Sequence, residues 1–276
     1  MSEDKLPNEL VFYCQELSQK FKEVWIIPLS DIHYGNPFFS AHHLTRAIDL
    51  IKSKPNYFTI LNGDLAECVI KSSKGDITTQ TAIVQKQYEY IRDIFMPIKH
   101  KILGITQGNH CYRIMDTAQI DLCDMWSKDW GCPYGREEIL LKVSFGQGAF
   151  RVQNQPYVFF IHATHGYGGA RTKGAKNVKV ERQSHQVHAD CYLQSHDHDA
   201  SVQTGVYLMP HNRIHIDERG FKAGGVHAVD KKLVKTGAFL KRGGYAARSG
   251  YDPVSLGLTY IKLQGNNGKA VVRVEQ

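Results

Sequence analysis

The segment "ADCYLQSHDHD", residues 189–199, changes abruptly from an apolar run to a row of histidines and aspartates. A short apolar run that is bounded by polar residues is typical of a buried strand. On an extended segment, residues two positions apart point the same way, so His196 and His198 face the same side. Such a pair can supply two metal ligands, but the chain has 14 histidines, and many of them must be ordinary.

The same local pattern occurs five times along the chain: an apolar, β-branched run ends in residues that can bind a metal. The five runs end at Asp31 and His33, at Asp64, at Asn109 and His110, at His162 and His165, and at His196 and His198. Their near-continuous hydrophobicity predicts strands that are covered on both faces. Residues 41–55, 78–98 and 116–131 repeat their apolar residues with helical spacing, and Gly131 is expected to cap the last of these helices.

Strands that alternate with helices predict a largely parallel sheet with right-handed crossovers. The carboxyl ends of such strands share one edge, and binding sites form in the crevice there. We therefore expect the five polar clusters to converge in space, although they span residues 31–198. A purely structural role would not explain why aspartate, histidine and asparagine recur at this one position.

The remainder of the chain predicts a second sheet. Residues 138–160 contain two further strands, and after residue 200 the sequence looks like short strands that are joined by turns. The stretch "GNNG", residues 265–268, is a typical hairpin signal. We predict an α/β fold in which two packed mixed β-sheets are flanked by helices. We expect a single domain over residues 1–276, with a helical N-terminal extension over residues 1–22.

The bulk composition is that of an ordinary soluble globular protein, with 42% hydrophobic and 22% charged residues. No apolar stretch reaches membrane-spanning length, and the acidic, polar "MSEDKLPNEL" does not resemble a secretory signal. We therefore expect a cytoplasmic protein without membrane contact. The six cysteines include no C-x-x-C pair, so we expect them to stay reduced and to form no thiolate zinc site.

The net charge of +7 favours polyanionic partners, although a basic surface can also serve solubility alone. Two basic stretches, residues 168–183 and 230–250, lie before and after the last histidine motif. The glycine-rich "GYGGARTKG", with Arg171, could contact a phosphate or form a plain flexible loop. Arg113 could likewise steady a phosphate or be a surface cation. The sequence does not indicate an oligomeric state.

Together these motifs resemble the calcineurin-like metallophosphoesterases. That family has the ordered pattern D-x-H, G-D, G-N-H-[D/E], a later histidine at a strand end, and G-H-x-H. In the same order, this sequence has "DIH" (31–33), "GD" (63–64), "GNH" (108–110), "HATHG" (162–166) and "SHDH" (195–198). The resemblance covers residues 24 to about 200, and the stretches "THGYGGARTKG" and "TGAFLKRGGYA" are similar to phage- and prophage-borne members.

The resemblance implies a four-layer α-β-β-α sandwich that holds two divalent transition-metal ions, with manganese expected first and iron, zinc or nickel as alternatives. The implied ligands are Asp31, His33, Asp64 and His198 for one metal, and Asp64, Asn109, His165 and His196 for the other. A hydroxide that bridges the metals would attack the phosphate ester. His165 is favoured over His162 because Gly166 follows it, as in the family's H-G. The resemblance implies that His110 is the general acid or charge stabiliser beside the leaving group.

Three departures from the family pattern affect the expected function. Cys111 stands where an acidic residue usually follows G-N-H, Ser195 replaces the glycine of the last motif, and "GDLAE" lacks the arginine of protein serine/threonine phosphatases. Together with the basic charge, this favours a phosphodiesterase or nuclease that acts on DNA or RNA. The alternatives are a small-molecule phosphomonoesterase, a cyclic-nucleotide phosphodiesterase, and a non-catalytic, metal-stabilised scaffold that binds a partner.

Overall fold

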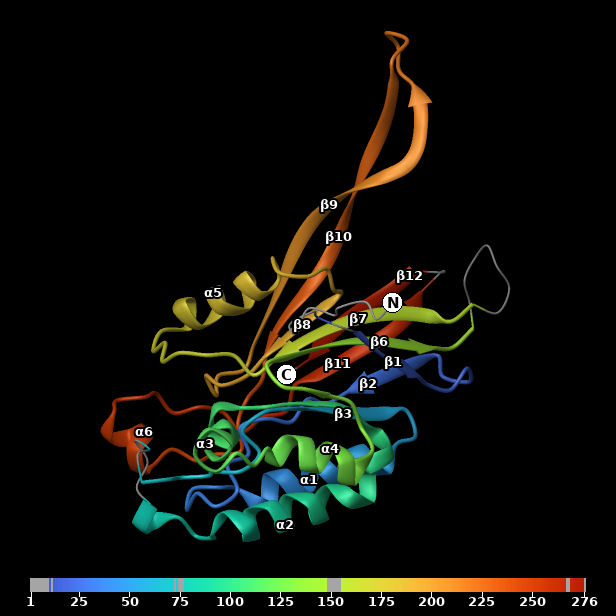
Figure 1. Ribbon diagram of the computed structural model, residues 1–276. Coiled ribbons are helices and arrows are strands. Elements are labelled where there is room, and N and C mark those ends of the chain that lie inside the picture. Colours follow the sequence, from blue (N-terminus) through green and yellow to red (C-terminus); the bar gives the residue numbers. More distant parts are fainter. Residues whose placement is uncertain are drawn as a thin grey trace, which may run out of the picture.

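The computed structural model describes residues 10, 12–71, 73, 77–147, 155–266 and 269–275. These residues form two six-stranded sheets with helices on their outer faces (Figure 1). The helices are α1 (Ala41–Ser53), α2 (Val84–Phe95), α3 (Asn109–Ala118), α4 (Leu122–Trp130), α5 (Lys173–Gln183) and α6 (Gly244–Arg248), with short 3-10 segments η1 (Ile77–Thr79) and η2 (Met96–Lys101).

The first sheet has the strand order β12-β11-β2-β3-β4-β5. Four of its strands run parallel, and a C-terminal hairpin adds two antiparallel strands at the β2 edge. Its strands are β2 (Glu23–Ile26), β3 (Tyr57–Asn62), β4 (Ile102–Thr106), β5 (Tyr134–Gly135), β11 (Tyr260–Asn266) and β12 (Lys269–Glu275).

The second sheet has the order β1-β6-β7-β8-β10-β9. In its centre β7, β8 and β10 run parallel; β6 runs antiparallel to β7 and parallel to β1, and β9 runs antiparallel to β10. Its strands are β1 (Phe12–Glu16), β6 (Glu138–Phe145), β7 (Tyr157–Thr164), β8 (Cys191–Gln194), β9 (Ser201–Ile216) and β10 (Lys222–Lys235).

Three buried clusters define four layers. Helices α1, α2 and α4 pack on the outer face of the first sheet, where Ile48, Ile91 and Trp126 belong to one apolar cluster. The facing sides of the two sheets form a second cluster, and α5 covers the second sheet with Val180. Each fully buried aliphatic side chain contributes about 1.5–3 kcal/mol to folding. The expected arrangement of two mixed sheets flanked by helices is confirmed.

The helical N-terminal extension is wrong for the described part of residues 1–22. Residues 12–16 form β1, which pairs in parallel with β6, and Tyr13 and Leu17 pack against the cluster between the sheets. The open edge of β6 offers unpaired backbone groups, and this tertiary pairing outweighs the local helical pattern. Residues 1–9 and 11 lie outside the described part of the chain.

Two predicted features have the right type but the wrong extent. The helix expected over residues 116–131 is divided: α3 ends at Ala118, Gln119 has a φ of 58°, and the Asp121 side chain caps α4. Gly131 ends α4 as expected, with a φ of 69°. The short strands expected between residues 200 and 240 are instead one long hairpin, β9 and β10, which extends far beyond the rest of the molecule (Figure 1), whereas the strands expected on either side of "GNNG" are confirmed as β11 and β12.

Candidate metal centre

The five loops that carry the predicted ligands meet at one end of the two sheets. Loops after β2, β3 and β4 bring Asp31, Asp64 and Asn109 from the first sheet, and loops after β7 and β8 bring His165 and His196 from the second. The sequence placed all five runs in one sheet, so their division between two sheets is a correction. The five polar clusters still converge, because the carboxyl ends of these strands in both sheets lie at the same end of the sandwich.

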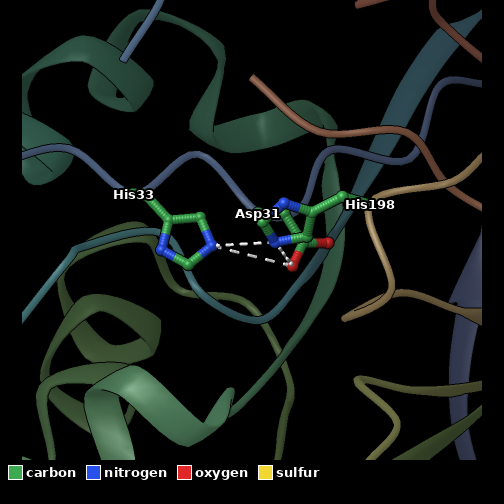
Figure 2. Close-up of side chains that lie close together, drawn as sticks. All are labelled: Asp31, His33 and His198. Atoms are coloured by element: carbon green, nitrogen blue, oxygen red, sulfur yellow. Dashed lines mark hydrogen bonds and ion pairs between the residues drawn. The ribbon is translucent and has the colours of Figure 1, made fainter. Parts of the chain in front are cut away.

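The first group of donor atoms comes from Asp31, His33 and His198, and a second group joins His33 to Asp64 and His110. Figure 2 shows the His33 and His198 rings turned toward the Asp31 carboxylate. Asp31 Oδ1 lies 3.1 Å from His198 Nε2 and 3.8 Å from His33 Nε2. His33 Nε2 lies 3.2 Å from His198 Nε2 and 3.9 Å from Asp64 Oδ2. Two ligands that each lie ~2.1 Å from one metal are separated by roughly 3.0–4.2 Å, depending on the angle at the metal, so these spacings suit a shared ion.

The remaining group of donor atoms comes from Asp64, His165 and His196. His165 Nε2 is 3.0 Å from Asp64 Oδ2, and His196 offers a nitrogen within 4.8 Å of both. His196 Nδ1 lies 2.9 Å from Asn109 Oδ1, and its Nε2 is held 2.5 Å from the Gly168 carbonyl oxygen. Asp64 therefore shares one group with His33 and another with His165 and His196, as expected of a bridging ligand.

Two buried atoms of the site have no hydrogen-bond partner. They are Asp31 Oδ1 and His165 Nε2, and both residues are at most 3% exposed. Leaving a buried polar atom without a hydrogen bond costs about 1–3 kcal/mol. Both atoms point into the donor groups, where a cation would satisfy them. The residues present therefore fit bound divalent metal.

The backbone at the site is strained. The left-handed residues are Asp31, His33, Asp64, His196 and His198, with φ between 49° and 71°. A non-glycine residue pays roughly 1–2 kcal/mol for this conformation. Hydrogen bonds from Asp31 N to Gly63 O (3.1 Å) and from His33 N to Asp64 O (3.0 Å) hold the first two loops together. Such concentrated strain is characteristic of functional sites.

At two positions of the motifs only glycine fits, because the side chain of a candidate ligand lies too close for a Cβ atom. A Cβ on Gly63, whose φ is 83°, would lie 2.4 Å from His165 Nδ1. A Cβ on Gly108 would lie 2.1 Å from Asp64 Oδ1 and 2.3 Å from the Asp64 backbone nitrogen. Any side chain at either position would therefore displace a candidate ligand.

The electrostatics of the site are dominated by buried carboxylates. Burial alone would raise the pKa of Asp31 and Asp64, but the surrounding histidines outweigh it and hold both pKa values below their usual range. Burial would lower the pKa of His33, but Asp31, Glu67 and Asp64 raise it to about 10. The pKa of His165 is raised in the same way, to about 9. The pocket therefore strongly attracts cations.

His110 lies at the start of α3, beside both donor groups. Its backbone N–H donates to Asp64 Oδ1 (2.8 Å), and its Nδ1 lies 2.7 Å from the Glu67 carbonyl oxygen. That carbonyl can only accept, so Nδ1 carries the proton and Nε2 faces the site, 3.9 Å from Asp64 Oδ2. Burial lowers the pKa of His110 to about 4, and the nearby charges of His33 and Arg113 act in the same direction.

Glu67 does the orienting work that the acidic residue missing at position 111 would do. Its carbonyl holds His110, and its carboxylate Oε2 lies 2.9 Å from His33 Nδ1. Outer groups of this kind fix the tautomer and direction of a ligating imidazole. Cys111 is wholly buried in the apolar cluster beneath the first sheet. In the sequence, Glu67 could equally have been a charge at a helix start.

Two lysine side chains anchor Asp197, which lies between His196 and His198. Asp197 Oδ2 lies 2.6 Å from Lys235 Nζ, and Asp197 Oδ1 lies 2.8 Å from Lys179 Nζ. Lys235 also donates to Gln194 Oε1 (3.0 Å) and is 1% exposed. This role of Lys235 has no signal in the sequence, where the residue is one cation of the basic stretch 230–250.

His162 and His165 have different surroundings. His162 is wholly buried, and its Nε2 lies 2.6 Å from Glu138 Oε2. Gln183 of α5 donates to the His162 carbonyl oxygen (3.0 Å). His165 instead lies among the donor atoms, with Nδ1 2.8 Å from the Asn62 carbonyl oxygen. The structure therefore brings His165, and not His162, to the candidate ligand set.

A cleft of about 1140 Å³ opens over the donor groups. Arg113 lines it, and its Nη1 lies 3.2 Å from His110 Nδ1. Arg171 is not among the lining residues; its guanidinium lies 5.6 Å from the ring centre of Tyr251, which does line the cleft. The further cationic residues of the lining are Lys176, Lys241, Arg242 and Arg248. They come from the two basic stretches that the sequence shows.

No protein-family profile matches the chain, and no curated protein matches it. No helix among the described residues is long and apolar enough to cross a membrane.

Several solved structures share the general arrangement of the chain. One is a predicted phosphoesterase from Streptococcus pneumoniae, with 12% identity, a TM-score of 0.37, and coverage of 92% of this chain and 90% of that one. Vacuolar protein sorting 29 from Cryptosporidium parvum has 14% identity, a TM-score of 0.42, and coverage of 92% and 98%. The Entamoeba histolytica homologue complexed with zinc has 10% identity, a TM-score of 0.36, and coverage of 91% and 98%. Likeness at this level carries no functional argument.

Proposed function

We propose that the chain is a calcineurin-like metallophosphoesterase that hydrolyses phosphate esters with two divalent metal ions. The observation that carries this proposal is the position of Asp64. Its carboxylate has His33 as a neighbour in one donor group and His165 and His196 in another, and the buried atoms Asp31 Oδ1 and His165 Nε2 lack hydrogen bonds, which supports two metals.

The chemistry of the donors supports transition metals. Imidazole and carboxylate together suit manganese, iron, nickel or zinc better than calcium. One metal would be held by Asp31, His33, Asp64 and His198, and the other by Asp64, Asn109, His165 and His196. When bound, the metals would neutralise the phosphoryl oxygens and lower the pKa of a water molecule.

The remaining steps belong to residues of the chain. Glu67 fixes the His110 ring, so that Nε2 is the nitrogen left to exchange a proton with a leaving-group oxygen. An anionic ester in the cleft would raise the low pKa of His110 toward the range needed for proton donation. Arg113, beside His110, would bind a phosphoryl oxygen.

We favour a phosphodiester substrate, with nucleic acid as its source. The cleft is larger than a single phosphate group requires, and cations line its walls. Phe38 and Tyr251 also line it and offer aromatic faces on which a base could stack. The net charge of +7 agrees with this choice.

The test combines metal analysis with a substrate panel. The wild-type chain, Asp64→Asn and the exposed control Asp49→Asn are loaded with manganese. Metal content and hydrolysis of bis-nitrophenyl phosphate, nitrophenyl phosphate, DNA and RNA are then measured. We expect about two metals per chain in the wild type and the control, fewer in Asp64→Asn, and diester cleavage only where the metals are bound.

Each other outcome removes a defined part of the proposal. A wild-type chain without bound metal contradicts the metal centre. Bound metal with no hydrolysis of any ester makes the chain a non-catalytic scaffold. Efficient monoester turnover, with no cleavage and no salt-sensitive binding of nucleic acid, replaces the diesterase by a small-molecule phosphomonoesterase.

A further inference from the structure

The distal part of β9 and β10 forms a two-stranded arm, defined here as residues 205–230. Among the described strands, β9 pairs only with β10, and β10 pairs with β8 only over Lys232–Lys235. Beyond that point the arm leaves the body of the molecule (Figure 1). An isolated two-stranded hairpin is marginally stable in water, and its free edges can pair with another chain.

One face of the arm is apolar. Residues directly opposite in an antiparallel pair share a face, so Leu208 lies beside Ala228, and Pro210 beside Val226. Ile214 stays on this face despite a register irregularity, because its partner Gly224 is two residues from Val226. The apolar face consists of Val206, Leu208, Pro210, Ile214, Ile216, Val226 and Ala228.

The large side chains of this face are unusually exposed for their type. Val206, Leu208, Ile214, Ile216 and Val226 are between 62% and 70% exposed. Single exposed apolar residues are ordinary, but a contiguous apolar face of this length marks an interaction site.

The position of the apolar face explains why its large side chains are exposed. Nearer the body, Val234 on the same face of β10 is wholly buried between the two sheets. The opposite face of the arm lies on the α5 side, where the Tyr207 hydroxyl is 2.6 Å from Ser184 Oγ. The apolar face therefore continues the inner face of the sandwich beyond the end of the first sheet. A sheet at that position would pack about 10 Å away.

We propose that the apolar face is a dimerisation surface on which the arm of a second copy packs antiparallel about a two-fold axis. In such an interface the same patch serves both copies. Lys222 lies opposite Ile216 at the tip of the face, and Asp230 lies opposite Val206 at its base. An antiparallel arrangement brings the lysine of one arm to the aspartate of the other, so the face complements itself in charge.

The area is sufficient for a stable dimer. Each large aliphatic side chain presents roughly 100 Å² of apolar surface. Five of them on each of two arms bury about 1,000 Å², which is the lower threshold for a biological interface, and Pro210, Ala228 and the backbone add to this area. A nucleic acid would meet few cations here, because Lys222 is the one cation that the pairing register places on this face.

Sedimentation velocity over a wide range of protein concentrations tests the proposal. We expect the wild type to sediment as a dimer, with twice the 31.3 kDa mass of one chain. Leu208→Glu with Ile214→Glu should give monomers. Met209→Glu with His215→Glu moves the same two charges by one position to the opposite face and should leave the dimer intact. A monomeric wild type, or equal behaviour of the two double variants, overturns the proposal.

A charge exchange tests the two-fold arrangement separately. Lys222→Asp alone and Asp230→Lys alone would each place like charges together, and both should weaken the dimer at least tenfold. The double exchange should restore it, whereas a double variant that is weaker than either single one contradicts the antiparallel packing. Flotation of a monomeric wild type with neutral lipid vesicles would show that lipid covers the face, which also overturns the proposal.

Discussion

Lys235→Met removes the buried support of the loop that carries two candidate ligands. Lys235 Nζ lies 2.6 Å from Asp197 Oδ2 and 3.0 Å from Gln194 Oε1. Asp197 stands between His196 and His198, so its anchoring determines where both imidazoles lie. Methionine keeps most of the aliphatic chain and removes the charge, so the change isolates the ion pair.

The expected loss of stability follows from the burial of the pair. Breaking a buried ion pair on one side costs about 3–5 kcal/mol, because the other charge stays buried. Lys179 Nζ remains 2.8 Å from Asp197 Oδ1, so we expect the lower end, about 3 kcal/mol in the free energy of unfolding. At ~2–4 °C per kcal/mol for a large domain, Tm should fall by roughly 6–12 °C. Metal affinity should fall about 10–100-fold, as when the outer support of a ligand is lost.

Thermal unfolding by circular dichroism and metal titration by calorimetry provide the measurements. Lys179→Met is the matched control: its side chain is 11% exposed, against 1% for Lys235, so its loss should be less than half as large. The reasoning is refuted if Lys235→Met is no less stable than Lys179→Met.

Three further outcomes follow from the site. His110→Ala should keep its metals and lose about 10²–10⁴-fold in rate on esters with poor leaving groups, but less on nitrophenyl esters; metal loss would contradict this role. Gly108→Ala should abolish metal binding measured by elemental analysis, because its Cβ would meet Asp64 Oδ1, whereas Gly174→Ala, which meets nothing within 4 Å, should bind metal normally. Arg248→Ala should weaken nucleic-acid binding and lower the slope of log affinity against log salt by about 0.9; an unchanged slope would remove Arg248 from the binding surface.

The candidate ligands could be predicted from the sequence because each is local to a strand end. A buried strand is read from a short apolar run, and the residue that follows the run is placed at the sheet edge by chain geometry alone. Asp64 and His196 are identified in this way. The choice of His165 over His162 needed a family resemblance, since both follow the same run, and the structure supplies the reason: His162 points toward Glu138.

Errors arose where distant segments compete for pairing. Residues 12–16 looked helical by themselves, and they form a strand because the edge of β6 is open. The first three apolar runs pair with one another, whereas the fourth and fifth pair in the second sheet. Neither outcome has a local signal, because strand pairing depends on backbone groups and shared faces that lie far away in the chain.

The sequence alone predicts the candidate donor residues, their order along the chain and the layered α/β architecture, because apolar periodicity and strand-end position are local properties. What supports and surrounds those candidate donors is visible only in the folded molecule. Glu67 reaches His33 across 34 residues, and Lys235 reaches Asp197 across 38. The alternating apolar residues of β9 were visible in the sequence, but their exposure depends on where the other sheet ends. Such contacts join residues that are far apart in the chain, and they therefore leave no periodic pattern in the sequence.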